Sequence, residues 1–324
     1  MNRVPSALTF LSLCLVCGCV LAQSWPAKPV KIVVSTGPGL ATDIIARILA
    51  DRLSRSMGQQ FVVENMAGAA GNIAAQAVAR AAPDGYTQLF TGGGVMITNA
   101  FAFKSLPFDP VKDFAPVVMI TESGGFVLSV NPEMPVKNLA ELIAAAKAQP
   151  GKYSYAVDRS NIYAAIIGKL LNKMVGLDIV EIPYKSTPQA LQDTVAGRTQ
   201  IIISAVAPVE AFARNGKLRR LAVSSAKRMP GLDELPTMAE TIDGFKIDGG
   251  GFAVVSPAAT PADIVQRLNR AIAAILRDAE FAKQMFSLGQ TAASGASPEA
   301  TAEYLRSERE RWGKIFKDLA IQPQ

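Results

Sequence analysis

Short apolar runs alternate along the chain with longer segments in which apolar residues recur at helical spacing. The first run, at residues 31–34, precedes a segment in which Ile45, Leu49 and Leu53 would share one face of a helix. Alternation of this kind is typical of helices layered on a mostly parallel sheet. The pattern therefore predicts an α/β fold whose strands end in connecting loops.

The loop between that first strand and that first helix is built mainly of small residues. Its sequence is Ser35-Thr36-Gly37-Pro38-Gly39-Leu40-Ala41-Thr42-Asp43. Backbone amides at the start of a helix are unpaired and lie at the positive end of the helix dipole, so they attract anions. The loop is therefore the first candidate for a ligand site, and the ligand it favours is an anion.

Two further strand ends lead into small-residue loops. A strand predicted at residues 60–64 is followed by a Gly/Ala-rich turn at residues 65–72, and a strand predicted at residues 87–90 is followed by a Gly-rich loop at residues 91–94. Ligands of open α/β sheets bind at the carboxyl ends of the strands. We expect these loops to lie beside the loop 35–43 and to share its ligand.

The middle of the chain repeats the order of strand, polar loop and helix, with strands predicted at residues 126–130, 153–156, 179–182 and 200–203. Glycine-bearing segments near residues 124 and 249 mark the points where the chain enters and leaves this block. We expect two α/β lobes joined by two hinge strands, with a ligand cleft between them. Lobe 1 would comprise residues 23–123 and 249–324, and lobe 2 residues 124–248.

Cap residues predict where several helices begin and end. Thr42 or Asp43 is expected to cap the first helix, and Gly58 to end it. Asn138, Thr187 and Ser297 are expected to cap later helices.

Residues 1–22 have the composition of a secretory signal peptide. Arg3 supplies the positive region, residues 7–20 are mostly apolar, and Val20-Leu21-Ala22 forms a small-residue cleavage site. We therefore expect an exported protein that resides in the periplasm. The sequence around Cys19 loosely resembles a lipoprotein box, and a lipid anchor there is the less favoured alternative.

The composition excludes several kinds of chemistry. The chain has no histidine, and its three cysteines, Cys14, Cys17 and Cys19, all lie within residues 1–22. Histidine-dependent catalytic triads, thiolate or imidazole metal sites and disulfides are therefore excluded for residues 23–324. We expect neither a metal nor a cofactor. The formal net charge of +6 suits an ordinary surface, and because no dense basic block occurs, nucleic acid is not an expected partner.

Three local patterns permit an enzymatic interpretation. Residues 37–42 lie where a dinucleotide fingerprint would, with Glu64 as a ribose ligand, but Thr42 replaces the third glycine. Residues 224–227 match S-x-x-K without the supporting motifs of that enzyme class, so a polar loop is the better interpretation. Asp43 and Glu64 could be paired carboxylates, although a helix-terminal role for Asp43 and a hydrogen bond from Glu64 to the following turn explain them better.

Several short segments occur together along the chain, and their combination is specific although each one alone is not. They are residues 61–65, 68–72 (Gly68-Ala69-Ala70-Gly71-Asn72), 77–81, 83–87, 106–110, 112–116, 130–132, 182–185, 236–240 and 256–261. In these segments the chain closely resembles the Bug-type periplasmic solute-binding proteins, the receptor components of tripartite tricarboxylate transporters. The resemblance covers essentially all of the chain after the signal peptide.

The resemblance implies a type II periplasmic-binding-protein fold that closes on a small carboxylate without converting it. It also implies that the ligand is held by the first strand–helix loop and the Gly-rich loops of lobe 1 and by strand-end loops of lobe 2, partly through water. The positions that it nominates are Gly39, Ala41, Thr42, Asp43, Gly71, Asn72, Thr91, Gly92, Ser160, Asn161, Tyr184 and Ser204.

The chain departs from the family pattern at three places. Leu40 and Ala41 stand where the family usually has glycine and serine, which exchanges a donor for apolar bulk. Arg159 could pair with a second carboxylate or point to solvent, whereas Asp158 would repel such a ligand if it faced the cleft. Ser204 stands where an aspartate is often found. An aromatic or more apolar carboxylate is therefore among the expected ligands.

The expected function is capture of a small organic carboxylate in the interlobe cleft and docking of the closed protein on the permease subunits of a tripartite tricarboxylate transporter. We expect a monomer without enzymatic activity. One alternative is a ligand-sensing subunit for a membrane sensor kinase, and a lower-ranked alternative is an exported NAD-dependent oxidoreductase.

Overall fold

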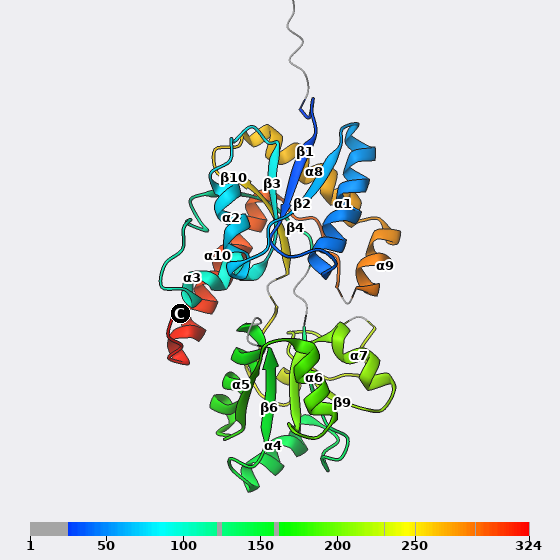
Figure 1. Cartoon of the computed structure of the whole chain (residues 1–324), viewed down its shortest axis with the longest axis vertical. Helices are drawn as coiled ribbons and strands as arrows, with labels where there is room; N and C mark the ends of the chain where they lie inside the picture. Colours follow the sequence, from blue (N-terminus) through cyan, green and yellow to red (C-terminus); the bar gives the residue numbers. More distant parts are fainter. Residues whose placement is uncertain are drawn as a thin grey trace, which may run out of the picture.

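The computed structural model describes residues 25–121, 125–158, 162–229, 231–249, 251–288 and 290–323. They form two α/β lobes, each built on a five-stranded sheet and stacked along the long axis of the molecule (Figure 1). The predicted signal peptide and the alternative of a lipid anchor at Cys19 lie outside the described residues, as do Arg159, Ser160 and Asn161. Within the described residues, no helix is both long and apolar enough to span a membrane.

Lobe 1 is formed by the first and the last parts of the described chain. Its elements are β1 Val30–Val34, α1 Ala41–Met57, β2 Phe61–Asn65, η1 Ala69–Gly71, α2 Asn72–Ala79, β3 Thr87–Gly92, η2 Gly94–Thr98, α3 Asn99–Ala102, β4 Phe114–Met119, β10 Phe252–Pro257, α8 Ala262–Leu276, α9 Ala279–Ser287 and α10 Pro298–Asp318. The strand order is β2-β1-β3-β10-β4, with β10 antiparallel to its neighbours. Side chains of α1, α8 and α9 pack on one face of the sheet, and those of α2 and α10 pack on the other.

Lobe 2 is formed by the middle of the chain. Its elements are β5 Phe126–Val130, α4 Leu139–Ala148, β6 Ser154–Asp158, α5 Ile162–Val175, β7 Val180–Tyr184, α6 Thr187–Val195, β8 Ile201–Ala205, α7 Val206–Arg214, β9 Arg219–Val223 and η3 Met238–Glu240. The strand order is β7-β6-β8-β5-β9, with β5 antiparallel to β8 and β9. Helices α6 and α7 pack on one face of this sheet and α5 packs on the other.

The two segments that connect the lobes lie side by side. The backbone N–H of Phe252 donates a hydrogen bond to Thr121 Oγ1 at 2.7 Å. Gly251 has a φ of +59°, and a Cβ there would lie 2.6 Å from the Thr121 carbonyl oxygen, so this close approach requires glycine. Because Gly92 pairs with Phe252 and Ala205 pairs with Phe126, the ends of β3 and β8 lie next to the connecting segments.

Several predicted loops begin too early, because the strands before them are longer than predicted. Thr91 and Gly92 belong to β3, where Gly92 pairs with Phe252. Asp158 and Tyr184 pair with each other at the ends of β6 and β7. Ser204 belongs to β8, where it pairs with β5. Pairing with a neighbouring strand therefore carries these polar residues into the sheet, and they lie at strand ends instead of in free loops.

Three of the predicted caps are confirmed. The side chains of Asn138 and Ser297 accept hydrogen bonds from backbone N–H groups in the first turns of α4 and α10. Gly58 ends α1 in the left-handed conformation, with a φ of 70°.

Two predicted caps are wrong by a few positions. Helix α1 begins at Ala41 with Leu40 as its cap, so Thr42 and Asp43 lie inside the first turn. Helix α6 begins at Thr187 itself, and Ser186 is its cap. The first error has a clear cause: the Asp43 carboxylate binds a backbone group of the preceding loop instead of closing its own helix, as described below.

Candidate functional site

The carboxyl ends of β1 and β3 and the turn before α2 converge on one side chain, Ser35. The Thr91 hydroxyl donates to Ser35 Oγ at 2.9 Å, and both residues are buried. Gly71 has a φ of +89°, and a Cβ there would lie 3.1 Å from Ser35 Cβ. Gly71 and Thr91, both predicted as site residues, are therefore brought together, and Ser35 joins them.

Asp43 fixes the shape of the loop between β1 and α1. Its carboxylate is 3% exposed and accepts hydrogen bonds from the Gly39 N–H at 2.9 Å, Arg47 Nε at 3.0 Å and Asn65 Nδ2 at 2.9 Å. Burial by itself would raise the pKa of Asp43, but the hydrogen bonds from Arg47, Gly39 and Asn65 outweigh burial and hold the pKa below its usual range. The Asn65 amide also donates to the Thr36 carbonyl, which ties the loop to the end of β2.

Asn72 lies at the start of α2 in a second buried network. The Asn99 side-chain amide donates to Asn72 Oδ1 at 2.7 Å and to the Ala70 carbonyl at 3.1 Å. Ala70 has a φ of 53°, which is unusual for a residue with a side chain, so the bond from Asn99 supports a strained turn. This network fixes the turn at residues 69–72 beside the loop 35–43.

Polar groups without a fixed role remain near this edge of the lobe 1 sheet. The Thr36 hydroxyl is buried and has no hydrogen-bond partner among the described residues, which suits a group that meets a ligand or a water. Thr42 is 6% exposed in the first turn of α1. Leu40, the cap of α1, is 56% exposed and presents apolar surface on the same loop.

Two polar side chains at strand ends of lobe 2 hydrogen-bond to helix α6. The Tyr184 hydroxyl donates to Asp193 on α6 at 3.0 Å, and burial and this carboxylate raise the pKa of Tyr184. Asp158 accepts a hydrogen bond from the Thr187 hydroxyl at 2.8 Å. Ser204 is buried near the end of β8, 6% exposed. The Tyr184 hydroxyl is thus directed towards α6.

Glu64 and Ser224, which the enzymatic interpretations singled out, make ordinary structural contacts. Glu64 forms an ion pair with Lys31 at 2.6 Å, so the predicted hydrogen bond to the following turn is wrong. Lys31 lies on the neighbouring strand β1, and the Glu64 carboxylate pairs with it and not with the turn. Ser224, the serine of the S-x-x-K pattern, accepts from the Phe126 N–H and donates to the Ile247 carbonyl. Within the described residues, no group of three or more acidic side chains could hold a metal ion.

A cavity of about 440 Å³ lies between α7 and α9, where lobe 2 faces lobe 1. Its lining includes Val206, Met229 and Leu232 from lobe 2 and Phe286 from lobe 1. The cavity contains none of the predicted site residues, although Val206, which directly follows β8, lines it.

The prediction missed the residues that hold the loops in place: Ser35, Arg47, Asn65 and Asn99. Ser35 and Asn65 each stand at the carboxyl end of a strand, so the same reasoning that nominated Thr91 could have found them. No pattern in the sequence points to Asn99, because its role depends on η2 turning back towards α2.

Comparisons with known proteins agree with the two-lobed fold. The model of the tripartite tricarboxylate transporter family receptor matches residues 45–321. A UPF0065 protein of Bordetella bronchiseptica is 34% identical over 302 residues, which cover 93% of this chain and 89% of that protein. The structure of R. palustris Rpa4515 with adipate is similar, with 34% identity, a TM-score of 0.80, and coverage of 93% of this chain and 100% of that one. The periplasmic binding protein BugD is 29% identical, with a TM-score of 0.76 and coverage of 93% and 100%.

Proposed function

Because the chain belongs to the tripartite tricarboxylate transporter receptor family and has the predicted periplasmic-binding-protein fold, we propose that it captures a small organic carboxylate between its lobes and delivers it unchanged to a membrane permease. In this proposal the protein acts in the periplasm as a monomer. Lobe 1 comprises residues 23–123 and 249–324, and lobe 2 comprises residues 124–248.

The observation that carries the proposal is the convergence of three strand-end segments of lobe 1 on Ser35. The loop 35–43, the turn 69–72 and the end of β3 are held by buried or partly buried hydrogen bonds, so their backbone amides have fixed directions. Fixed amides at helix starts are suited to a carboxylate, because little conformational freedom is lost when the anion binds. The similar R. palustris protein, whose structure contains adipate, supports the same class of ligand.

Charge at the site is compatible with an anion although Asp43 lies in it. Arg47 is 3.0 Å from the Asp43 carboxylate, and two further hydrogen bonds spread the carboxylate's charge. A bound carboxylate would therefore meet a compensated charge and not a bare one. We propose that Asp43 and Gly39 shape the loop, since the Gly39 N–H is already engaged.

The residues proposed to meet the ligand come from both lobes. Lobe 1 supplies the Thr36 hydroxyl, which the sequence prediction did not nominate, as well as nominated residues. Lobe 2 closes over the anion from the ends of β6, β7 and β8. The nominated residues kept in this proposal are Ala41, Thr42, Gly71, Asn72, Thr91, Gly92, Ser160, Asn161, Tyr184 and Ser204.

Calorimetric titration with adipate, and with a series of mono-, di- and aromatic carboxylates, tests the proposal. We expect at least one carboxylate to bind, and Thr42→Val to weaken that binding about tenfold by removing a hydroxyl while keeping the shape of the side chain. Asp51→Ala is the matched control, because Asp51 lies on the same helix with its side chain exposed. No binding by any carboxylate, or turnover of a substrate, would contradict the proposal.

A further inference from the structure

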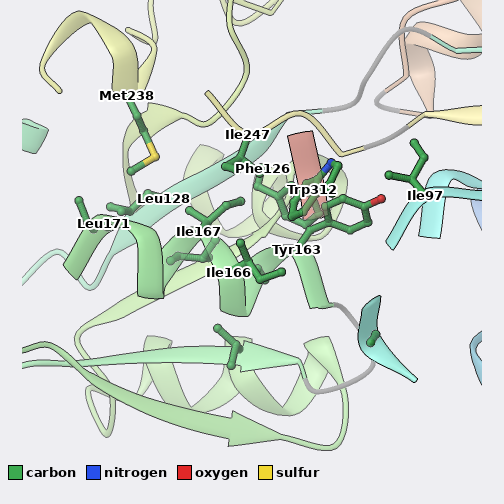
Figure 2. Packing of buried hydrophobic residues seen from close by; sticks show 14 of the residues in the cluster. Ile97, Phe126, Leu128, Tyr163, Ile166, Ile167, Leu171, Met238, Ile247 and Trp312 are labelled. Carbon is green, nitrogen blue, oxygen red and sulfur yellow. The ribbon is translucent and has the colours of Figure 1, made fainter. Parts of the chain in front are cut away.

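On the side of α5 and α10, the hydrophobic core is continuous between the two lobes. A single cluster of buried residues contains Leu89 of β3 and Trp312 of α10 together with Tyr163 of α5 and Leu128 of β5. Figure 2 shows Trp312 and Tyr163 packed against each other beside Phe126, which begins β5. We call this region the α5–α10 contact.

The α5–α10 contact is dense and combines ring packing with hydrogen bonds. Trp312 is fully buried, and its ring meets that of Tyr163 edge-on, with centroids 4.9 Å apart and an angle of 88° between the planes. Phe126 also stacks on the Tyr163 ring, with the ring centroids 6.0 Å apart. Lys173 of α5 donates to the carbonyl of Asp318, the last residue of α10. Aromatic pairs of this geometry contribute beyond the area that they bury.

On the side of α7 and α9, the lobes contact each other differently. Phe286 of α9 is 50% exposed, and its ring lies over Gly231, where a Cβ would fall 2.0 Å from the ring. The buried residues on the two sides belong to separate clusters: Met285 packs in lobe 1, and Met229 and Leu232 pack in lobe 2. The cavity of about 440 Å³ lies between them. We call this region the α7–α9 contact.

Separating two surfaces costs free energy in proportion to the apolar area that becomes exposed. Opening at the α5–α10 contact would expose a fully buried tryptophan and the rings packed on it, whereas opening at the α7–α9 contact would free one ring that is already half exposed. We propose that the lobes open at the α7–α9 contact by turning about the α5–α10 contact, and that Phe286 seated on Gly231 is the latch of the closed form.

The latch is linked to the end of β8. Helix α7 begins at Val206, two residues after Ser204, and lines the cavity that faces Phe286. Rotation about the α5–α10 contact therefore moves the end of β8 away from lobe 1. Phe286 therefore acts by holding the two lobes together and not by touching the ligand. The inference does not depend on whether the ligand is a carboxylate.

Distances between spin labels in the ligand-free full chain test the inference. With its three native cysteines replaced by serine, one labelled pair, Lys217→Cys and Lys283→Cys, reports on the α7–α9 side. A second pair, Met174→Cys and Lys314→Cys, reports on the α5–α10 side. Each pair is measured in the otherwise unchanged chain and with Phe286→Ala, Gly231→Ala or the control Val111→Ala, which truncates another exposed apolar residue of lobe 1.

We expect Phe286→Ala and Gly231→Ala each to shift the 217–283 distances to longer values and to leave the 174–314 distances unchanged. Phe286→Ala should leave the melting temperature close to that of the control, whereas Gly231→Ala should lower it, because Gly231 has a φ of +74°, a conformation that disfavours a side chain. Equal lengthening of both pairs would refute the pivot, and no change in either pair would refute the latch. Adipate is then added as a probe. If the unchanged chain binds adipate, we expect Phe286→Ala to weaken binding severalfold, because less of the protein is closed, and unchanged affinity would count against the latch. Failure of adipate to bind bears on the proposed function and leaves the distance test standing.

Discussion

The two halves of the proposed site are held in different ways. In lobe 1, the key hydrogen bonds join one strand-end segment to another: Thr91 to Ser35, Asn65 to Asp43, and Asn99 to Asn72. In lobe 2, the two comparable bonds both involve α6: Tyr184 of β7 donates to Asp193, and Thr187 donates to Asp158 of β6. Lobe 1 is therefore a cross-linked platform of three strand-end segments, whereas the ends of β6 and β7 in lobe 2 are both held by one helix, α6.

This difference suggests that the two lobes have different roles in ligand binding. A cross-linked platform offers fixed backbone amides and suits the feature that all candidate ligands share, the carboxylate. Strand ends that are held through one helix can change without remodelling the loops of the platform in lobe 1, and the departures at Asp158 and Ser204 fall at such strand ends of lobe 2. The four predictions below test this comparison, beginning with the change that should have the largest effect.

Asp43→Ala should have the largest effect because it removes the acceptor for three donors at once. The free energy of unfolding should fall by about 2–3 kcal/mol, since the Gly39 N–H and the Arg47 guanidinium lose an ionised acceptor in a partly buried site. Urea denaturation measures the loss. The loop would also lose its fixed shape, so binding of any carboxylate ligand should weaken more than tenfold.

Asp51→Ala provides the matched control for Asp43→Ala. Asp51 pairs with Arg55 on the same helix, and both side chains of this pair are more than half exposed. An exposed pair of this kind contributes about 0.5 kcal/mol or less. If the two variants lost the same stability, the view of lobe 1 as a cross-linked platform would be wrong.

The role of Asp43 shows which features of the structure could be predicted from the sequence and which could not. The pattern of strands and helices predicted two α/β lobes, and the family resemblance predicted the fold, which the comparisons confirm. Residue patterns also placed Asp43 at the start of a helix. They could not show that its carboxylate turns back to Gly39 and across to Asn65, because this depends on how β1 and β2 lie side by side.

Other parts of the fold left weaker signals in the sequence. Strand β4 and helices α7 and α9 were not predicted: Pro116 argues against a strand, and the two helices are only nine residues long. The strand ends at Asp158, Tyr184 and Ser204 were placed in loops, since polar residues at the end of a strand resemble a loop until the pairing is known. The contacts between the lobes could not be predicted, because they join residues from three separate parts of the chain.

Asn99→Ala should have the second largest effect. It leaves Asn72 Oδ1 and the Ala70 carbonyl without their donor in a buried site, which should cost about 1–3 kcal/mol. Asn99 is not proposed to touch the ligand, yet the turn 69–72 would loosen, so ligand affinity should also fall. Asn215→Ala, at the exposed end of α7, is the control for chemical denaturation and calorimetry. Lost stability with unchanged affinity would place the ligand away from this turn.

The pH dependence of stability isolates the charge of Asp43. Its pKa is lowered in the folded protein, so its carboxylate adds stability above its unfolded pKa of about 3.9, and this stability is lost as the pH falls through the folded pKa. The variant Asp43→Asn has a neutral amide in place of this charge. The difference in urea midpoint between the wild type and Asp43→Asn should therefore be constant near neutral pH and shrink below about pH 4. A difference that grows on acidification would reverse the sign expected from the hydrogen bonds.

Tyr184→Phe should have the smallest effect and tests the lobe 2 side of the comparison. It removes one partly exposed hydrogen bond, to Asp193, and should cost about 0.5–1 kcal/mol in the free energy of unfolding. Because the hydroxyl is directed towards α6, ligand affinity should change less than twofold as long as Tyr184 meets the ligand only through its ring or backbone. Calorimetry with the best carboxylate measures this change. A tenfold loss would mean that the hydroxyl leaves Asp193 for the ligand on closure, and lobe 2 would then supply a specific donor as lobe 1 does.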